Sequence, residues 1–383
     1  MNFNRVVIKV GSALVAPDAK GCSGKYLLAI ARFITQCHLA GKEVILVSSG
    51  SVAAGRKLIQ HGSPVPSIPT KQAMAAVGQM QMMANWQRFF DVPCSQLLIT
   101  HGDLKDRQRY INIKNTLRIL LENHVIPVVN ENDTVATDEL KVGDNDNLAA
   151  LVALVSEADR LLILSDVDGV FDKDPRSHDD AKMLPEIAEI TPEIYAMAAG
   201  TKNHLATGGM QTKIQAAEKA VENGIDTYIV NGTNSEVFER LLKGQNPGTH
   251  FIARQGVTKA RKHWLKHTLK SDGQVLVDLG AVNAVSEKGA SLLPSGILGV
   301  RGEFVAGASL EIVNADGGEV IAKGICQYSH RDLQQIKGQK SDQIYHLLGF
   351  CPSKVVIHRD DMVVLTKTIS NNGKTVKTGR EDD

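Results

Sequence analysis

Short apolar runs alternate with helical stretches through the first two thirds of the chain, and this alternation constrains the fold more than any other feature. The runs are dominated by β-branched and other apolar residues and so predict strands. They are Arg5–Val10, Glu43–Val47, Gln96–Ile99, Ile126–Val129, Arg160–Ser165 and Asp226–Val230. Several are almost wholly apolar, which is typical of strands buried on both faces. The pattern therefore predicts an α/β fold, a three-layer α/β/α sandwich around a mainly parallel sheet.

Helical stretches separate these strands. They are Lys25–Ala40, Thr70–Phe90, Lys114–Asn123, Asn145–Glu157 and Gly209–Asn223. The stretch Thr70–Phe90 has apolar surface to spare, and we therefore expect a homo-oligomer, either a dimer or a tetramer. Four methionines in this stretch fit packing better than a cofactor site. They are Met74, Met80, Met82 and Met83.

The pattern changes near residue 255. A basic stretch without acidic residues, 259–270, precedes short strand-like runs with frequent glycine: Gln274–Leu279, Ser309–Val313, Glu319–Ile325 and Lys354–Ile357. We therefore expect an α/β domain over 1–255, a basic linker over 256–272, a small, mostly β domain over 273–366 and a disordered tail over 367–383. His263 and His267 have the spacing of metal ligands, but no third ligand is in view and we expect no metal site.

Length and composition narrow the class of protein. A chain of 383 residues favours two domains. The net charge of +1 argues against nucleic acid or membrane as the main partner, and no apolar run reaches the roughly 18 residues of a membrane span. The cysteines are odd in number and form no CxxC pair, which indicates free thiols in a reducing cytoplasm. They are Cys22, Cys37, Cys94, Cys326 and Cys351.

A cluster of Asp and Asn residues begins the predicted helix Asn145–Glu157. The cluster is Asp144, Asn145, Asp146 and Asn147, directly after Gly143. One such residue is enough to cap a helix. The excess predicts a polar site at the helix N-terminus, where the backbone dipoles favour anions.

Polar residues also follow several of the predicted strands. They are Lys9 with Gly11, Ser48–Ser51, Asn130–Asp133 and Ser165 with Asp166. Ligands of open α/β sheets bind beyond the carboxyl ends of the strands, so these residues together predict one site. Taken singly, each has a plainer interpretation, such as a surface lysine before a turn, a serine cap or an Asx turn before Gly169.

Paired glycines, Gly208 and Gly209, precede the amphipathic helix that contains Lys213. Such glycines expose backbone N–H groups that bind anions. A lysine in the first turn opposes the helix dipole, and a bound phosphate would remove that conflict. The segment lacks the spacing of a Walker A loop, and no dinucleotide-binding fingerprint follows the first strand. It therefore predicts a phosphate site of another kind.

Taken together, these segments closely resemble the amino acid kinase family, and within it the enzymes that phosphorylate glutamate. The resemblance runs in order through Lys9–Gly11, Val47–Gly50, Pro127–Asp133, Val142–Asn147, Ser165-Asp166 and Thr207–Lys213. It continues into the second domain, where Gly289–Ile297 resembles part of a PUA domain. The combination is specific, although no single segment is. It implies the amino acid kinase fold followed by a PUA-like domain.

The resemblance also implies roles for individual residues. Lys9 and Lys213 would neutralise the phosphoryl group during transfer, and Asp146 would orient both lysines. Ser49, Asp133 and Asn145 would bind glutamate. ATP would be bound by Lys9, Ser165, Asp166, Thr207, Gly208, Gly209, Met210, Gln211, Thr212 and Lys213.

The implied reaction transfers the γ-phosphoryl group of ATP to the γ-carboxylate of L-glutamate, the first step of proline biosynthesis. This carboxylate is already ionised at pH 7, so no general base is required. The obstacle is repulsion between two anions, which two lysines, helix N-termini and Mg²⁺ would offset. We expect Mg²⁺ to sit mainly on ATP phosphates and water rather than on protein ligands. The resemblance further implies that proline inhibits by competing for the glutamate pocket.

Two other functions remain open from sequence alone. A related kinase of the same fold would act on aspartate, N-acetylglutamate, carbamate or a nucleoside monophosphate, and fold does not decide among these. The Asp/Asn-rich helix start and the PUA-like domain favour free glutamate. An RNA-binding or regulatory protein is the second alternative, since PUA domains often contact RNA, but the near-neutral net charge argues against it.

Overall fold

The computed structural model describes residues 3–17, 21–60, 62, 65–136, 145–199, 209–254 and 271–365. The chain divides into two compact units, Met1–Thr258 and Lys259–Asp383. Most of the expected linker and the whole expected tail, 367–383, lie outside the described residues, so their extents stay predictions.

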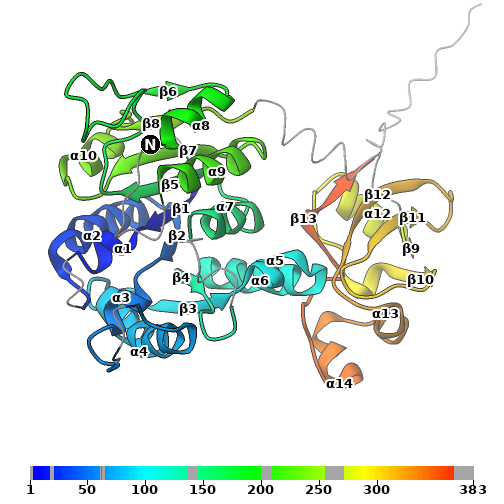
Figure 1. Ribbon diagram of the computed structural model, residues 1–383. Coiled ribbons are helices and arrows are strands. Elements are labelled where there is room, and N and C mark those ends of the chain that lie inside the picture. Colours follow the sequence, from blue (N-terminus) through cyan, green and yellow to red (C-terminus); the bar gives the residue numbers. More distant parts are fainter. Residues whose placement is uncertain are drawn as a thin grey trace, which may run out of the picture. The chain divides into compact units, whose positions relative to one another are not determined.

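An eight-stranded sheet in the order β3-β4-β2-β1-β5-β7-β8-β6 forms the centre of the first unit (Figure 1). Its strands are β1 (Arg5–Val10), β2 (Glu43–Ser48), β3 (Cys94–Ile99), β4 (Ile126–Glu131), β5 (Arg160–Ser165), β6 (Glu186–Ile187), β7 (Asp226–Asn231) and β8 (Thr249–Phe251). All neighbouring pairs are parallel except β7 and β8. The predicted mainly parallel sheet is confirmed.

Helices cover both faces of this sheet. They are α1 (Ser12–Val15), α2 (Gly24–Leu39), α3 (Ser51–Gly55), α4 (Ile68–Gln87), α5 (His101–Lys105), α6 (Arg107–Glu122), α7 (Asn145–Val155), α8 (Pro192–Ala199), α9 (Met210–Val221) and α10 (Glu236–Leu242). Figure 1 shows α2 and α10 on one side of β1 and α7 and α9 on the other. Val6 and Ile8 pack with the first pair and Val7 with the second, because successive strand residues point to opposite faces. The three-layer sandwich is confirmed.

The parallel register brings the carboxyl ends of the central strands to one edge of the sheet. Val10 on β1 pairs with Ser48 on β2 and with Leu164 on β5. Strand β4 lies beside β2, and its last residues are Asn130 and Glu131. The polar segments that follow these strands therefore meet at this edge, beside the central strand.

Two glycines bring the short helix α3 against α4. A Cβ atom at Gly55 would lie 2.0 Å from the carbonyl oxygen of Met74, and one at Gly78 would lie 1.9 Å from that of Ser51. Such distances leave no room for any side chain at either position. The backbone of α4 consequently runs directly against the segment that follows β2.

The second unit contains a five-stranded sheet in the order β10-β9-β11-β12-β13. Its strands are β9 (Gly273–Val277), β10 (Ile297–Arg301), β11 (Ser309–Asn314), β12 (Val320–Cys326) and β13 (Ile357–Val364). Short helices accompany them: α12 (Leu279–Ser286), η2 (Pro294–Gly296), α13 (His330–Ile336), η3 (Ser341–Gln343) and α14 (Ile344–Leu348). The predicted small, mostly β second unit is confirmed.

Several predicted boundaries differ from the observed ones. The last strand begins at Ile357, where the predicted run Lys354–Ile357 ends, and the preceding Val356 bonds the backbone of Leu292 and Gln327 outside the ladder of the sheet. Helix α6 begins at Arg107 rather than Lys114, because the Asp106 side chain caps it by accepting from the Arg109 backbone N–H. Strand β10 and helix α12 were not predicted.

No helix in the described part of the chain is both long and apolar enough to span a membrane.

Met74 and Met82 are buried in packing contacts, as predicted, whereas Met80 is 77% exposed on the outer face of α4.

Candidate active site

The carboxylate of Asp146 holds the ammonium groups of two lysines. Lys9 Nζ lies 2.6 Å from Asp146 Oδ1, and Lys213 Nζ lies 3.2 Å from Oδ2. The Thr212 hydroxyl donates to Oδ2 at 2.8 Å. The carboxylate is fully buried, and both lysines are at most 6% exposed. The three predicted catalytic side chains thus form one buried cluster.

Each member of this cluster comes from a different element. Lys9 lies near the carboxyl end of β1, Asp146 in the first turn of α7 and Lys213 in the opening turn of α9. A carboxylate is favoured at the N-terminus of α7, but a cation at the start of α9 opposes the dipole. Asp146 compensates for Lys213 in this position, and a bound anion at the helix start would do so as well.

The electrostatics of the cluster combine burial with strong charge pairing. Burial favours the neutral form of Asp146, but the nearby Lys213 and Lys9 outweigh it and hold the pKa of this carboxyl far below its usual range. Burial lowers the pKa of Lys9, and repulsion from Lys213 adds to this effect against the attraction of Asp146. Two lysines share the Asp146 carboxylate, and a concentration of buried cations like this one is suited to an anionic ligand.

A second polar cluster lies at the ends of β2 and β4. Asn145 Nδ2 donates to Ser49 Oγ and to Asn130 Oδ1, both at 2.9 Å. Ser51 Oγ donates to Asp133 Oδ2 at 2.8 Å. The backbone N–H of Ser49 donates to the Val10 carbonyl, which ties this cluster to the end of β1. Ser49, Asp133 and Asn145 are therefore held around the ends of neighbouring strands, as predicted from their positions in sequence.

The Asp133 carboxylate has no ion-pair partner among the described residues. Burial raises its pKa, and the hydrogen bond from Ser51 only partly opposes this shift. A half-buried carboxylate without a cation is suited to a positively charged ligand, since pairing removes the cost of burying the charge.

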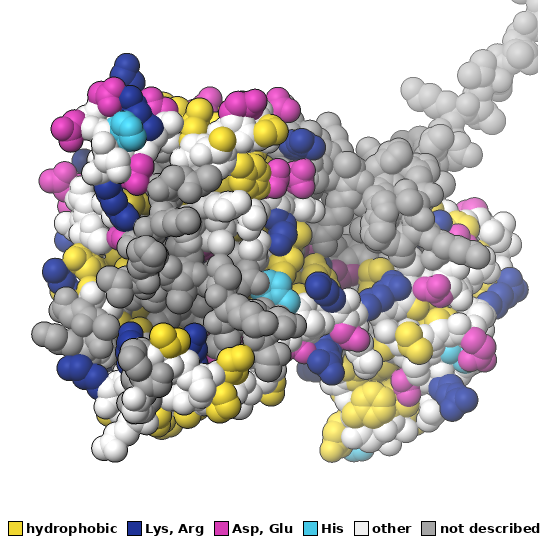
Figure 2. All heavy atoms as spheres, viewed as in Figure 1, with side chains coloured by type: hydrophobic (Ala, Val, Ile, Leu, Met, Phe, Trp, Pro, Cys, Tyr) yellow, Lys and Arg dark blue, Asp and Glu magenta, His cyan; other side chains and the backbone are white. Residues whose placement is uncertain are grey.

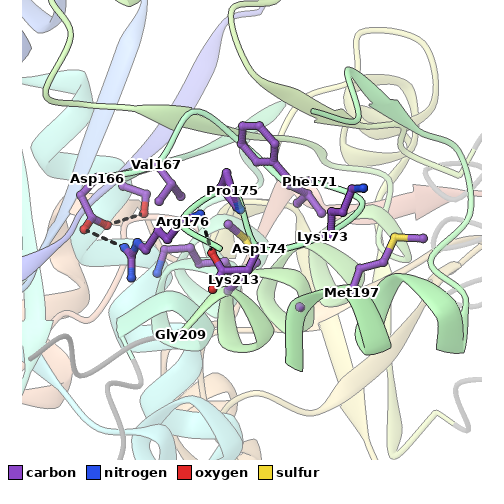
Figure 3. Close-up of a pocket in the computed structure, with 15 residues that line it drawn as sticks. Asp166, Val167, Phe171, Lys173, Asp174, Pro175, Arg176, Met197, Gly209 and Lys213 are labelled. Carbon is purple, nitrogen blue, oxygen red and sulfur yellow. Dashed lines mark hydrogen bonds and ion pairs between the residues drawn. The ribbon is translucent and has the colours of Figure 1, made fainter. Parts of the chain in front are cut away.

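A pocket open to solvent adjoins Lys213 on the side of β5 (Figure 3). Ser165, Asp166, Gly209 and Met210, which were predicted to bind nucleotide, line this one pocket. Ser165 Oγ donates to Asp166 Oδ1 at 3.3 Å. Further lining residues were not predicted, among them Phe171, Lys173, Pro175, Arg176 and Met197. The apolar members of this wall are suited to the flat face of a base.

Arg176 closes one side of this pocket. Figure 3 shows its guanidinium extending toward Asp166, and its nitrogen lies 3.9 Å from Asp166 Oδ2. The loop that carries it is held by the Arg176 backbone N–H, which donates to Asp174 Oδ1. The only sequence signal for this wall was Gly169, whose Cβ would lie 2.5 Å from Thr249 Oγ1.

The remaining residues that were predicted to bind nucleotide lie in different surroundings or outside the described residues. Thr207 and Gly208 lie outside the described residues. Gln211 is exposed at the start of α9, and Thr212 bonds Asp146. Asn130, which the sequence placed only in a polar cluster, bonds Asn145 and also Gln79 of α4. Gln79 was missed because a single glutamine in an apolar helix gives no motif.

The described residues contain no group of three or more His, Cys, Asp or Glu side chains that could hold a metal ion. Both oxygens of Asp146 are engaged by lysines, which makes this carboxylate unsuited to bind a divalent cation.

Residues 4–231 match the model of the amino acid kinase family, and residues 273–348 match that of the PUA domain. The chain is 54% identical to a glutamate 5-kinase of Idiomarina loihiensis over 95% of its own length and 98% of that protein. It is 53% identical to a glutamate 5-kinase of Salinibacter ruber over the same shares of the two chains. A glutamate 5-kinase of Xanthomonas euvesicatoria is 46% identical over 94% of this chain and 100% of the relative.

Replacing Asp146 by Asn should lower the free energy of unfolding by about 3–5 kcal/mol, because it leaves two buried lysines without their counter-ion. The folded pKa of Asp146 lies below its ordinary value of 3.8, so its stabilisation is present above that pH and is lost as the pH falls. Urea denaturation at pH 7 measures the loss. Asp180→Asn, which removes an exposed partner of Lys173, is the matched control and should cost less than about 1 kcal/mol. Equal stability of D146N and wild type would contradict the role of the pair.

Proposed function

Because the chain belongs to the amino acid kinase family, and within it to the glutamate 5-kinases, we propose that the Lys9–Asp146–Lys213 cluster is its phosphoryl-transfer centre. The enzyme uses ATP to phosphorylate the γ-carboxylate of L-glutamate and forms L-glutamate 5-phosphate, the first step of proline biosynthesis. The single observation that supports this centre is the pair of buried lysines on one carboxylate.

In the proposed mechanism a γ-carboxylate oxygen of glutamate attacks the γ-phosphorus of ATP. The bond from that phosphorus to the β,γ-bridging oxygen breaks, and the electron pair leaves with ADP. The nucleophile is ionised at pH 7, so no side chain needs to remove a proton. The barrier comes from bringing two anions together, and each unit-charge pair at 4 Å costs about 4 kcal/mol at an effective dielectric near 20.

Lys9 and Lys213 offset this repulsion. Both ammonium groups are held before substrates arrive, so little reorganisation is needed during transfer. Bound phosphates favour the protonated form of Lys9 and thereby counteract the effect of burial on its pKa. We assign Asp146 to orienting the lysines, because its low pKa and its two ion pairs make it a poor proton acceptor.

The nucleotide occupies the pocket beside β5 in this proposal. Phe171, Pro175 and Met197 supply apolar contacts for the base, and Asp166 is available to a ribose hydroxyl. The phosphates extend toward the start of α9, where Gly209, Met210 and Lys213 line the pocket. Mg²⁺ enters with ATP, because phosphates and water supply the oxygen ligands this ion prefers and Asp146 does not fit as one.

Glutamate binds at the second polar cluster. We place its α-ammonium at Asp133, whose carboxylate has no cationic partner among the described residues, and its polar contacts at Ser49 and Asn145. Its γ-carboxylate then points toward the lysines. An acceptor without an ammonium group, such as N-acetylglutamate, would leave Asp133 unpaired, which favours an amino acid with a free α-ammonium over N-acetylglutamate, carbamate or a nucleoside monophosphate.

RNA binding is the less favoured alternative for the PUA unit. Figure 2 shows acidic and basic side chains interspersed on the described surface of both units in this view, which is unlike the one-sided basic surface of a protein that binds RNA mainly through phosphates. The expected homo-oligomer stays a prediction, and the exposed side chains of Val77 and Met80 on α4 are compatible with it.

Lys9→Met and Lys213→Met should each lower kcat by about 10²-fold, the scale of a lost transition-state donor. Glutamate-dependent ADP release, with hydroxylamine to trap the acyl phosphate as a hydroxamate, measures the effect. Lys219→Met is a matched control, because Lys219 lies on the same helix but bonds Asn147 instead of Asp146. Near-normal turnover in both variants would rule out charge neutralisation by these lysines.

Asp133→Asn should raise the KM for glutamate at least about 10-fold, the equivalent of about 1.4 kcal/mol, because the α-ammonium loses its counter-ion. The raised pKa of Asp133 means that folding favours its protonated form, so its contribution to stability is present at low pH and is lost as the pH rises through that pKa. At neutral pH the variant should therefore be at least as stable as wild type. A lower unfolding midpoint in thermal denaturation would count against this assignment.

Proline should compete with glutamate, because its secondary ammonium can pair with Asp133 in place of the α-ammonium of glutamate. We expect added proline to raise the apparent KM for glutamate and to leave the maximal rate unchanged. Initial rates over a matrix of both amino acids give the result. Glutamate saturation curves that do not move with proline would overturn this expectation.

A further inference from the structure

Gln79 is a polar exception on the buried face of α4. That face otherwise consists mainly of apolar or small residues such as Met74, Ala75, Gly78 and Met82. Only 7% of Gln79 is exposed. A buried amide is costly unless its hydrogen bonds are made, so its partners indicate its role.

The amide of Gln79 is the first member of a chain of three. Asn130 Nδ2 donates to Gln79 Oε1 at 2.9 Å, and Asn145 Nδ2 donates to Asn130 Oδ1 at the same distance. Asn145 Nδ2 also donates to Ser49 Oγ. The three amides connect α4, the end of β4 and the start of α7, which form one side of the glutamate-binding cluster.

Within this group of three amides, two buried atoms make no hydrogen bond in the described part of the protein: Gln79 Nε2 and Asn145 Oδ1. Buried polar atoms are rarely left unpaired in a native protein without a functional reason. The unpaired oxygen is on a residue that the proposed function assigns to glutamate binding.

We infer that Gln79 is a positioning residue that, through Asn130, makes Asn145 present its Oδ1 to the α-ammonium of the amino acid substrate. The inference rests on the proposed function and adds a determinant of substrate selectivity to it. Gln79 does not touch substrate itself.

The direction of the hydrogen bonds carries this inference. An amide has a donor end and an acceptor end. In the structure Gln79 offers its oxygen as the acceptor, and Asn130 turns its NH₂ group toward α4 and its oxygen toward Asn145. Asn145 then has to donate with its own NH₂ group, which leaves its oxygen for the ligand. An oxygen in this position accepts from an ammonium group and repels a carboxylate.

The packing of α4 keeps Gln79 in reach of Asn130. Gly78, the preceding residue, has its Cα against the Ser51 carbonyl, so α4 cannot move away from the end of β2 without opening this contact. The position of the amide is therefore set by backbone contact and not by the flexible side chain alone.

The test compares Gln79→Met, which removes the acceptor, with Gln79→Glu, which keeps an acceptor oxygen whether ionised or protonated. Gln81→Met, at an exposed position of the same helix, is the control for the change in composition. Each variant is assayed as the full chain for the KM of glutamate, the KM of ATP and inhibition by glutarate, which lacks the α-ammonium group.

We expect Gln79→Met to raise the KM for glutamate about 10-fold and to leave the inhibition constant of glutarate and the KM of ATP within about 3-fold of wild type. Gln79→Glu and Gln81→Met should resemble wild type. If Gln79 had a merely structural role, its loss would weaken the binding of glutamate, glutarate and ATP together, or would change only the unfolding midpoint. Either result overturns the inference. Unchanged kinetics of Gln79→Met in an active enzyme also overturn it.

Failure of the proposed function gives a different result. A wild-type chain that shows no glutamate-dependent ADP release would disprove the kinase assignment, and the role of Gln79 with it. An active wild type whose Gln79→Met variant still discriminates glutamate from glutarate would disprove only the role of Gln79.

Discussion

The buried contact of Lys9 and Lys213 with Asp146 is the interaction on which the site depends. Two lysines cannot stay charged in an apolar interior without a counter-ion, and one carboxylate compensates for only one of them. This pairing of two buried cations with one carboxylate is the basis for the phosphoryl-transfer role that we propose for the cluster. The geometry that permits it requires β1, α7 and α9 to converge, and the parallel sheet provides this by ending its central strands at one edge.

Around this charged centre lie neutral amides and hydroxyls, which form directional hydrogen bonds but have no net charge. Hydrogen bonds join the amides of Gln79, Asn130 and Asn145, and we infer that they orient Asn145 toward the amino acid. Asp133 adds a carboxylate on that side of the site that has no ion-pair partner among the described residues, and burial raises its pKa. In the function we propose, the two halves of the site therefore bind opposite ends of glutamate, the lysines its γ-carboxylate and Asp133 its ammonium.

The residues that line the pocket beside β5 show why part of the site could not be predicted from the sequence. Phe171, Pro175 and Arg176 lie in a loop without periodicity or a recognised spacing, and their function depends on how the loop folds beside β5. Gln79 is a similar case. Its sequence neighbours predict a packed helix, and only the contact of Gly78 with Ser51 brings its amide to Asn130.

The sequence by itself determined the alternation of strands and helices, the parallel sheet and the polar residues at the strand ends, because burial and helix capping act within a few residues of chain. It also led to Lys9, Asp146 and Lys213, although their cooperation was implied only by resemblance. The tertiary structure decided which side chains touch, since the separation of Lys9 from Asp146 along the chain gives no distance in space. It also decided the direction of each hydrogen bond, because an amide takes its orientation from partners on other elements.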